Sequence, residues 1–331
     1  MNPKNIIAHR GLYNMKSSLT LTQSLLLSSI IFPFLLVAYI HTIWASELYF
    51  VDAHSQADHN LKNLELIIQR MNDGGVYRTI LSARSGRKPE EIASFAEAHS
   101  DRIIPAVRTK SDAYNKNHPK YFKELRKQID CGRFKAMAEV LMYHAQKGDK
   151  APEVVVYPKD QRVQAALNAS IENDWPFVIH IEFQSLKEKK RQQFMGEMEE
   201  MLKAHSDHPF ALNHMGQLSV DEVRRLIKHH QNIYFLTAHT NPVIINQSNQ
   251  PWMNMFQGAV LSPEWKDLLE QHPERFIFAL DNVWDRHWKE FYLDQMEYWR
   301  KAIADLPDDV AHAIAHRNAE RLWKIEPKPD K

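Results

Sequence analysis

The chain has 331 residues, 42 of them basic and 41 acidic, so its formal net charge is only +1. This balance argues against a dedicated nucleic-acid-binding surface, which needs a clustered positive field. The single cysteine, Cys131, excludes an intramolecular disulfide and a cysteine-based zinc site, and no glycine-rich phosphate-binding motif is present.

The first feature in chain order is an apolar segment, Leu19–Trp44, which contains no Asp, Glu, Lys or Arg. Because Lys16 precedes it, residues 1–45 have the pattern of a signal peptide. About 20 apolar residues also suffice to span a bilayer, so a retained membrane anchor is one alternative and a buried helix is another. We expect the folded region to work in the periplasm or another extracytoplasmic space, with membrane contact only through this segment.

Short apolar strands alternate with longer helical patterns over residues 47–325, which predicts repeated βα units around a parallel sheet. Eight strands are expected: Leu48–Ala53, Tyr77–Ser82, Ile103–Val107, Ala136–Leu141, Phe177–Ile181, Phe210–Asn213, Ile233–Leu236 and Phe276–Ala279. Eight is the number that a closed barrel needs. We therefore predict a (β/α)8 TIM barrel over residues 47–325, followed by a polar tail at 326–331.

Polar residues follow several of these strands, at the end where barrel enzymes carry their catalytic groups. Strand 1 runs into Val51-Asp-Ala-His-Ser-Gln56, and alternation predicts Asp52, His54 and Gln56 on one face. The residues that follow the fifth to eighth strands are His180, Glu182, His214, His239 and Asp281. A polar group here is costly unless it meets water, a partner or a metal ion.

A single histidine after a strand is usually a structural, hydrogen-bonded residue, but this pattern recurs on several strands. The recurrence favours a functional role for His54, His180, His214 and Asp281, and less strongly for His239. Imidazole and carboxylate ligands suit a divalent metal ion, with zinc expected and iron or manganese as alternatives.

Other polar residues are expected at the same rim. Arg84 and Arg108, after the second and third strands, could hold a substrate carboxylate, or could form rim salt bridges. Glu139, in the fourth strand, and Glu182 need partners, such as Arg108 or a metal-bound histidine, and with His239 they are candidates for substrate binding. Trp284, which follows Asp281, could line the pocket or serve as a packing residue.

Together these motifs resemble the amidohydrolase superfamily, and most closely its amidohydrolase-2 branch, over residues 47–325. The segments that carry the likeness are Val51-Asp-Ala-His54, His180, His214-Met-Gly216, Asp281 and Ile314-Ala-His-Arg-Asn-Ala-Glu-Arg-Leu322. The branch includes lactone hydrolases and decarboxylases of aromatic and muconate-type acids.

The resemblance implies a centre of one or two metal ions. The family's His-x-His motif maps to His54 and Gln56. His180 and Asp281 map to the ligands of strands 5 and 8, and His214 maps to the ligand or catalytic histidine of strand 6. Asp281 would also shuttle a proton. The chain departs from the family at Gln56, because an amide is a poorer ligand than imidazole.

Three functions remain open from the sequence. The first is a metal-dependent hydrolase of a small amide, lactone or ester, in which Asp281 takes a proton from a metal-activated water and His214 ligates the metal or stabilises an oxyanion. The second is a metal-dependent, non-oxidative decarboxylase of a small carboxylic acid. The third is a catalytically inactive exported barrel that binds a ligand, which Gln56 favours. Each has a small molecule as its partner.

Overall fold

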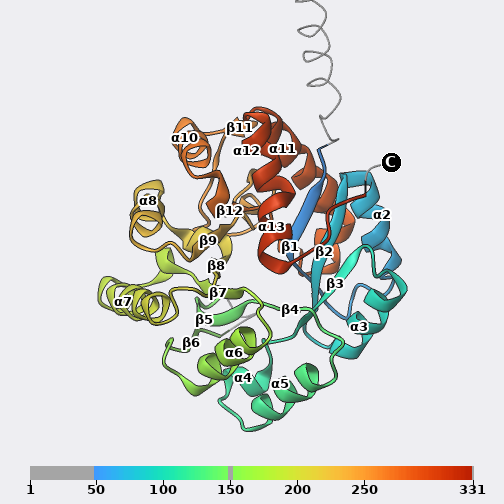
Figure 1. Ribbon diagram of the computed structural model, residues 1–331, viewed down its shortest axis with the longest axis vertical. Coiled ribbons are helices and arrows are strands. Elements are labelled where there is room, and N and C mark those ends of the chain that lie inside the picture. Colours follow the sequence, from blue (N-terminus) through green and yellow to red (C-terminus); the bar gives the residue numbers. More distant parts are fainter. Residues whose placement is uncertain (1–47, 148–151, 330–331) are drawn as a thin grey trace, which may run out of the picture. The chain divides into compact units, whose positions relative to one another are not determined.

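The structure is a computed structural model that describes residues 48–147 and 152–329 (Figure 1). The apolar segment Leu19–Trp44, with its predicted role as signal peptide or anchor, lies outside these ranges. Within them, no helix combines the length and the apolar character needed to cross a membrane.

The strands form two main sheets whose neighbours run parallel. One sheet has the order β1-β2-β3-β4 and the other the order β12-β9-β8-β7-β5-β6, in which β6 is antiparallel to β5. The strands of these sheets are β1 (Phe50–Ala57), β2 (Val76–Ala83), β3 (Ile103–Val107), β4 (Ala136–Met137), β5 (Val140–His144), β6 (Val154–Val155), β7 (Phe177–Ile181), β8 (Phe210–Leu212), β9 (Ile233–Leu236) and β12 (Phe276–Ile277). A separate hairpin consists of β10 (Phe256–Gln257) and β11 (Val260–Leu261).

Main-chain hydrogen bonds connect the first strand with the segment that follows the last one. Ala53 N donates to Phe278 O at 3.1 Å, and Asp281 N donates to His54 O at 2.8 Å. On the opposite side, β4 and β5 are successive parts of one strand position. The two sheets therefore form a ring in which the eight expected strand positions are all occupied by described residues.

The fourth strand differs from the prediction. The expected strand Ala136–Leu141 is broken into β4 and β5, and Ala138 and Glu139 lie between them. Glu139 is fully buried although it carries a carboxylate. The break follows from this burial, because the Glu139 side chain bonds with groups inside the ring.

Helices follow most strands, and most of them surround the strands (Figure 1). They are α2 (Glu65–Gly74), α3 (Pro89–Ala98), α4 (Asp112–Asn115), α5 (Lys120–Asp130), α6 (Gln161–Glu172), α7 (Glu188–Ala204), α8 (Val220–His229), α9 (Pro242–Ile245), α10 (Pro263–Gln271), α11 (Tyr292–Ala304), α12 (Asp308–His312) and α13 (Asn318–Trp323). Local sequence defines several starts. At α8, for example, Ser219 and Glu222 form a reciprocal capping box.

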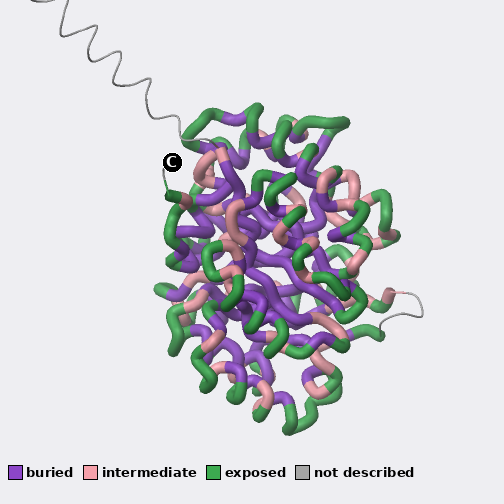
Figure 2. The backbone as a smooth tube through the Cα atoms, turned by 90° about the vertical axis from the view of Figure 1, so that its right-hand side faces the viewer, coloured by how far each residue is buried: buried purple, intermediate pink, exposed green. Residues whose placement is uncertain are grey.

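Apolar side chains form two clusters. The larger one lies between strands and helices, and includes Phe177 on β7 and Trp299 on α11. The smaller one is rich in alanine on and beside the strands, and it also contains Leu322 and Trp323 from α13. Figure 2 shows the resulting pattern, with buried backbone inside and exposed backbone on the surface. Because the smaller cluster fills one end of the ring with apolar groups, the buried histidines and carboxylates that follow the strands lie toward the other end.

Candidate active site

Two buried carboxylates, Glu139 and Asp281, are linked by side chains of β1. The Gln56 amide donates to both, at 3.1 Å to Glu139 Oε1 and 2.8 Å to Asp281 Oδ1. His54 Nε2 lies 3.4 Å from each of the same two oxygens. Residues from the first, fourth and eighth strand positions therefore meet, as expected at the carboxyl end of a barrel.

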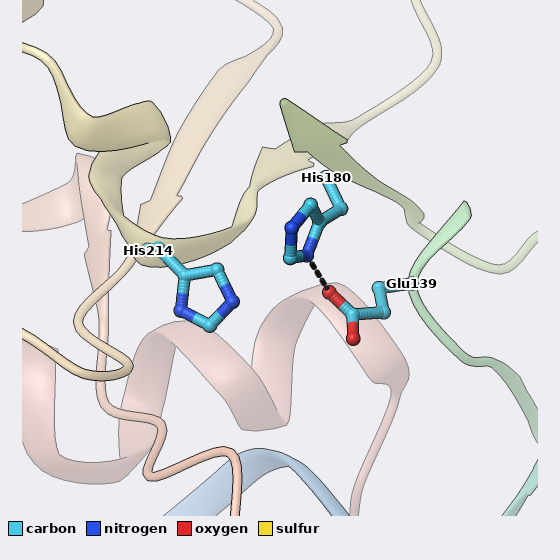
Figure 3. A group of neighbouring side chains, drawn as sticks. All are labelled: Glu139, His180 and His214. Atoms are coloured by element: carbon cyan, nitrogen blue, oxygen red, sulfur yellow. Dashed lines mark hydrogen bonds and ion pairs between the residues drawn. The ribbon is translucent and has the colours of Figure 1, made fainter. Parts of the chain in front are cut away.

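His180, on β7, lies between two carboxylates. Its Nδ1 is 2.5 Å from Glu139 Oε2, the contact drawn in Figure 3, and its Nε2 is 3.3 Å from Glu182 Oε1. A neutral imidazole has one N–H and could donate to only one of these carboxylates, whereas a protonated imidazole could donate to both.

His214 follows β8 and reaches the same group of residues. Its Nε2 lies 3.3 Å from Asp281 Oδ2, and its Nδ1 lies 3.3 Å from the carbonyl oxygen of Ala238. A carbonyl oxygen can only accept, which places the proton on Nδ1 and leaves Nε2 bare. Asn213 Nδ2, 3.2 Å from Nε2, can donate to this bare nitrogen.

His239, after β9, stacks on the His214 ring with centroids 4.6 Å apart. Its Nε2 donates to the main-chain oxygen of Asp281 at 3.0 Å. Trp252 contacts both imidazoles, with ring centroids 4.8 Å from His214 and 5.1 Å from His239. The loop after β9 thus supplies an aromatic wall beside the two histidines.

Three of these residues have left-handed backbone conformations, with φ of 54° at His214, 58° at His239 and 48° at Asp281. Residues other than glycine adopt this region at a cost of about 1–2 kcal/mol each. After β8 the conformation continues through Gln217, so that four consecutive residues have positive φ. Such strain persists where the surrounding structure fixes it, and it is concentrated at functional sites.

A β-bulge changes which side chains of β1 point to the same face of the strand. Its register with β2 shifts between Asp52 and Ser55, so simple alternation does not continue through the strand. The Asp52 carboxylate accepts from Ser55 Oγ at 2.5 Å and from Leu280 N at 3.0 Å. The prediction that Asp52 shares a face with His54 and Gln56 is therefore wrong. Asp52 instead ties β1 to the last strand position.

The central carboxylates are ionised. Burial would raise the pKa of Glu139, but Lys110 and His180 outweigh it and hold the pKa well below its usual range. Burial and the Glu139 charge would raise the pKa of Asp281, yet three neighbouring imidazoles lower it overall. Two buried negative charges are thus maintained within one hydrogen-bonded group.

The pKa values of His214 and His54 are shifted in opposite directions by their surroundings. Burial, followed by His239 and His180, lowers the pKa of His214 well below its usual range. Burial would also lower the pKa of His54, but Asp281 and Glu139 outweigh it and raise the pKa overall. His214 is therefore neutral, whereas His54 is the imidazole at which positive charge is favoured.

Of the remaining predicted residues, some join the central cluster and others lie apart from it. Glu182 joins the cluster through His180, and its Oε1 also lies 3.0 Å from Lys147 Nζ. The Arg108 guanidinium donates to the main-chain oxygens of Lys110 and Arg87, so it supports the loop after β3.

Arg84 and Trp284 form a pair of their own. The Arg84 guanidinium lies 6.0 Å from the Trp284 ring, and Trp284 is 39% exposed. No contact of either with the central carboxylates is found among the described residues, and their role in substrate binding stays a prediction.

Sequence reasoning missed several members of the site. They are Lys110, which contacts Glu139 Oε1, Asn213, which donates to Glu139 Oε2 at 2.7 Å, and the rim residues Lys147 and Trp252. Lys110 and Asn213 lie within three residues of a strand end, which is the signal that identified the histidines. Lys147 and Trp252 lie in longer loops, where strand spacing gives no guidance.

The cluster fits a divalent metal ion. Within the part of the chain that the structure describes, three groups bring ligand atoms within 4.8 Å of one another: Glu139 with His180 and His214; His214 with His239 and Asp281; and His54 with Glu139 and Asp281. The 3.4 Å spacings around His54 equal the edge of a tetrahedron with bonds of roughly 2.1 Å. The buried His54 Nε2 has no hydrogen-bond partner, and both nitrogens of His180 face carboxylates.

A family model described as amidohydrolase matches residues 68–325, which is well over half of the chain. The chain belongs to the amidohydrolase-2 family. The match confirms the resemblance seen in the strand-end motifs. Members of the amidohydrolase superfamily are generally hydrolytic enzymes, and they typically use a divalent metal ion. Comparison with curated proteins gave no match.

Solved structures support the fold. An uncharacterised TIM-barrel protein from Bordetella bronchiseptica is similar with a TM-score of 0.54 and 15% identity, over 80% of this chain and 83% of that one. A probable 2-pyrone-4,6-dicarboxylic acid hydrolase from Acinetobacter baumannii has a TM-score of 0.51 and 10% identity, over 84% and 100% of the two chains. Dihydroorotase from Campylobacter jejuni has a TM-score of 0.51 and 12% identity, over 86% and 85%. These likenesses show the TIM-barrel fold alone.

Proposed function

We propose that this amidohydrolase is a metal-dependent hydrolase of a small amide, lactone or ester. The observation that carries the proposal is the buried meeting of imidazoles and ionised carboxylates from different strand positions. Keeping several ionisable groups out of water is costly unless they hold a cation or a substrate. Family membership supports a hydrolytic reaction over an unrelated chemistry.

The candidate ligands for the ion are His54, Glu139, His180, His214 and Asp281. When bound, a divalent ion would supply Lewis acidity, which polarises a carbonyl and makes a water molecule more acidic. Zinc fits a set of imidazole and carboxylate ligands, and iron and manganese share this preference.

Asp281 would act as the proton carrier. Its Oδ1 accepts from Gln56 and its Oδ2 faces His214 Nε2, so the ionised carboxylate is held in a fixed orientation. It would take a proton from the attacking water and return it to the leaving group, which is general base and then general acid catalysis. Neutral His214 would ligate the ion through Nε2, because its proton lies on Nδ1 and a bare nitrogen has no hydrogen to offer a developing oxyanion.

Trp252 would help exclude water from the reacting groups. Its ring covers one side of His214 and His239, and Lys147 Nζ lies 4.8 Å from its centroid. Excluding water strengthens the electrostatic interactions inside a site.

The direct test is a screen of small amides, lactones and esters, with purified protein supplied with zinc, iron or manganese. The expected result is hydrolysis that a chelator abolishes and metal restores. Carbon dioxide release is measured on small carboxylic acids in parallel. Decarboxylation without hydrolysis would replace the proposed reaction with the decarboxylase, and activity that survives complete metal removal would contradict metal dependence.

A catalytically inactive barrel that binds a ligand is the second candidate. Gln56 favours it, because its amide hydrogen-bonds with both carboxylates where the family has a metal-binding histidine. Metal analysis separates the two candidates. A stoichiometric metal that is lost in His180→Ala supports the hydrolase, whereas a metal-free protein of unchanged stability supports the binding barrel.

We also propose that the barrel works outside the cytoplasm, on the basis of the apolar segment Leu19–Trp44. The test is cell fractionation with a C-terminal tag on the full chain. Extracytoplasmic or membrane-attached protein is expected, and a tag found only in the cytoplasm would contradict the proposal. Loss of residues 1–45 from the mature chain would distinguish a signal peptide from an anchor.

A further inference from the structure

The two oxygens of Glu139 face different candidate metal groups. Oε1 lies 3.4 Å from His54 Nε2, and Gln56 links it to Asp281. Oε2 lies 2.5 Å from His180 Nδ1, on the side where His214 also lies (Figure 3). We call His54, Glu139 and Asp281 the first group, and Glu139, His180 and His214 the second group.

A lysine side chain, Lys110, already provides a positive charge beside the first group. Lys110 follows β3, is 8% exposed, and forms an ion pair with Glu139 through Oε1. Thr109 Oγ1 donates to the main-chain oxygen of Glu139 at 2.5 Å, which fixes this loop beside the carboxylate. Gln56 adds an amide N–H to the same oxygen. Glu139 Oε1 therefore already has a charged donor and a neutral donor.

The second group lacks such a cation among the described residues, and its imidazoles are arranged as ligands. The far nitrogen of His180 lies 3.3 Å from Glu182 Oε1, which can accept from it once a metal ion takes the near nitrogen, and the Ala238 carbonyl accepts from the far nitrogen of His214. A hydrogen bond on the far nitrogen orients a histidine and leaves its near nitrogen free for a metal ion. Both near nitrogens point to the side of Glu139 or Asp281.

The remaining group, His214 with His239 and Asp281, is a poor ligand set. His239 Nε2 is its nitrogen nearest to Asp281, and it donates to the Asp281 main-chain oxygen. A nitrogen that carries a proton cannot ligate a metal ion, so this group could use only His239 Nδ1, which has no hydrogen-bond partner but is the nitrogen farther from Asp281.

We propose that Lys110 occupies the cation position of the first group, so that a divalent ion binds only in the second group. The inference rests on the proposed metal-dependent function and assigns its ligands. Repulsion between the ammonium and a metal ion would oppose a second ion beside Glu139 Oε1. Lys110 thus acts as a positioning residue that sets both the number and the place of metal ions.

The first experiment locates the ion. Chelator-treated protein is titrated with zinc, and bound metal is measured by calorimetry and elemental analysis. The native chain is expected to bind one zinc. His180→Ala should weaken zinc binding by about 100-fold or more, whereas His54→Ala should change it by less than about tenfold. Equal losses in the two variants would overturn the assignment to the second group.

The second experiment tests Lys110. Gln56→His restores the family's pair of histidines and is expected to leave the stoichiometry at one, because Lys110 remains. Adding Lys110→Met to Gln56→His should raise it to two zinc ions per chain. Two ions in Gln56→His alone, or one in the double variant, would overturn the role of Lys110. Thermal unfolding of each variant confirms that it is folded.

Lys147 provides the matched control, because it pairs with Glu182 on the other side of His180. Lys147→Met combined with Gln56→His should still bind one zinc, and a second ion there would show a general charge effect that contradicts the proposal. The same measurements also distinguish a failure of this inference from a failure of the proposed function. Two ions in the native chain overturn the inference alone, whereas no zinc in the native chain and the double variant overturns both.

Discussion

Asp281 is the side chain whose loss has the clearest chemical consequence. Asp281→Asn keeps the shape of the side chain and removes its ability to take a proton. We expect kcat to fall by roughly 10²–10⁴-fold, the usual contribution of general acid–base catalysis. Steady-state kinetics on a substrate found in the screen would measure it.

The same variant should still bind one zinc if the second group holds the ion. Asp285→Asn is its control, because Asp285 lies in the same loop and pairs with Lys289 on the surface. A loss of less than tenfold in Asp281→Asn, or an equal loss in Asp285→Asn, would argue against Asp281 as the proton carrier.

At the residue level, the sequence predicted the contacts that follow strand ends. His54, His180, His214 and Asp281 lie together as expected, because parallel strands in a ring end at one face. Lys110 also lies near a strand end, but that position alone does not assign it to the site, since a lysine after a strand is ordinarily solvated. Only its burial against Glu139 identifies it, and that contact joins positions far apart in the sequence.

The turn after β8 is the element on which His214 depends. Gly216 has φ of +64°, and a Cβ atom there would lie 2.5 Å from Leu212 Cδ2. Leu212 is fully buried, so it has little room to move. We expect Gly216→Ala to reduce the free energy of unfolding by about 3 kcal/mol, from backbone strain and overpacking together.

Gly258 allows the two effects to be separated. Its φ is +65°, but a Cβ atom there would have no neighbour within 4 Å. Gly258→Ala should therefore cost only about 1 kcal/mol, from strain alone. Urea unfolding would measure both variants, and equal losses would show that the contact with Leu212 contributes nothing.

Sequence patterns identified the strands and helices well but missed two interruptions. The bulge in β1 and the break between β4 and β5 both arise where a buried polar side chain needs a partner. Asp52 finds Ser55 Oγ and Leu280 N, and Glu139 finds Lys110 and His180. Local propensity contains no information about such distant partners, so the alternation rule failed at these points.

At the scale of the whole molecule, a cluster of polar side chains connects the start of β1 with α13 near the end of the chain. Tyr49 donates to Glu320 Oε1 at 2.6 Å, and His316 Nδ1 lies 2.9 Å from Glu320 Oε2. The Tyr49 and His316 rings also stack, with centroids 4.0 Å apart. Because Glu320 is only 8% exposed, its charge relies on these partners.

The cluster predicts a pH-dependent contribution to stability. Burial would raise the pKa of Glu320, but hydrogen bonds with His316 and Tyr49 outweigh it and lower the pKa below its ordinary value of 4.5. A depressed carboxyl pKa stabilises the fold above that value, and the contribution is lost as the pH falls through the folded-state pKa. We expect Glu320→Gln to lower the free energy of unfolding by about 1.5–3 kcal/mol at pH 7.

The difference between Glu320→Gln and the native chain should shrink below pH 4.5, where the native carboxyl becomes protonated. Urea unfolding at a series of pH values measures it. The exposed Glu326 supplies the control, and Glu326→Gln should change stability little at any pH. A difference for Glu320→Gln that stays constant with pH would contradict a charged contribution.

The hydrogen bonds between β1 and the segment after β12 have a consequence for synthesis on the ribosome. Residues near position 50 receive their neighbours only after residues near position 280 have been made, and α13 arrives later still. Until then the growing chain presents an open sheet edge, which is prone to pairing with other chains. An emerging chain of this protein would therefore be most exposed to aggregation, and most in need of chaperones, just before the barrel can close.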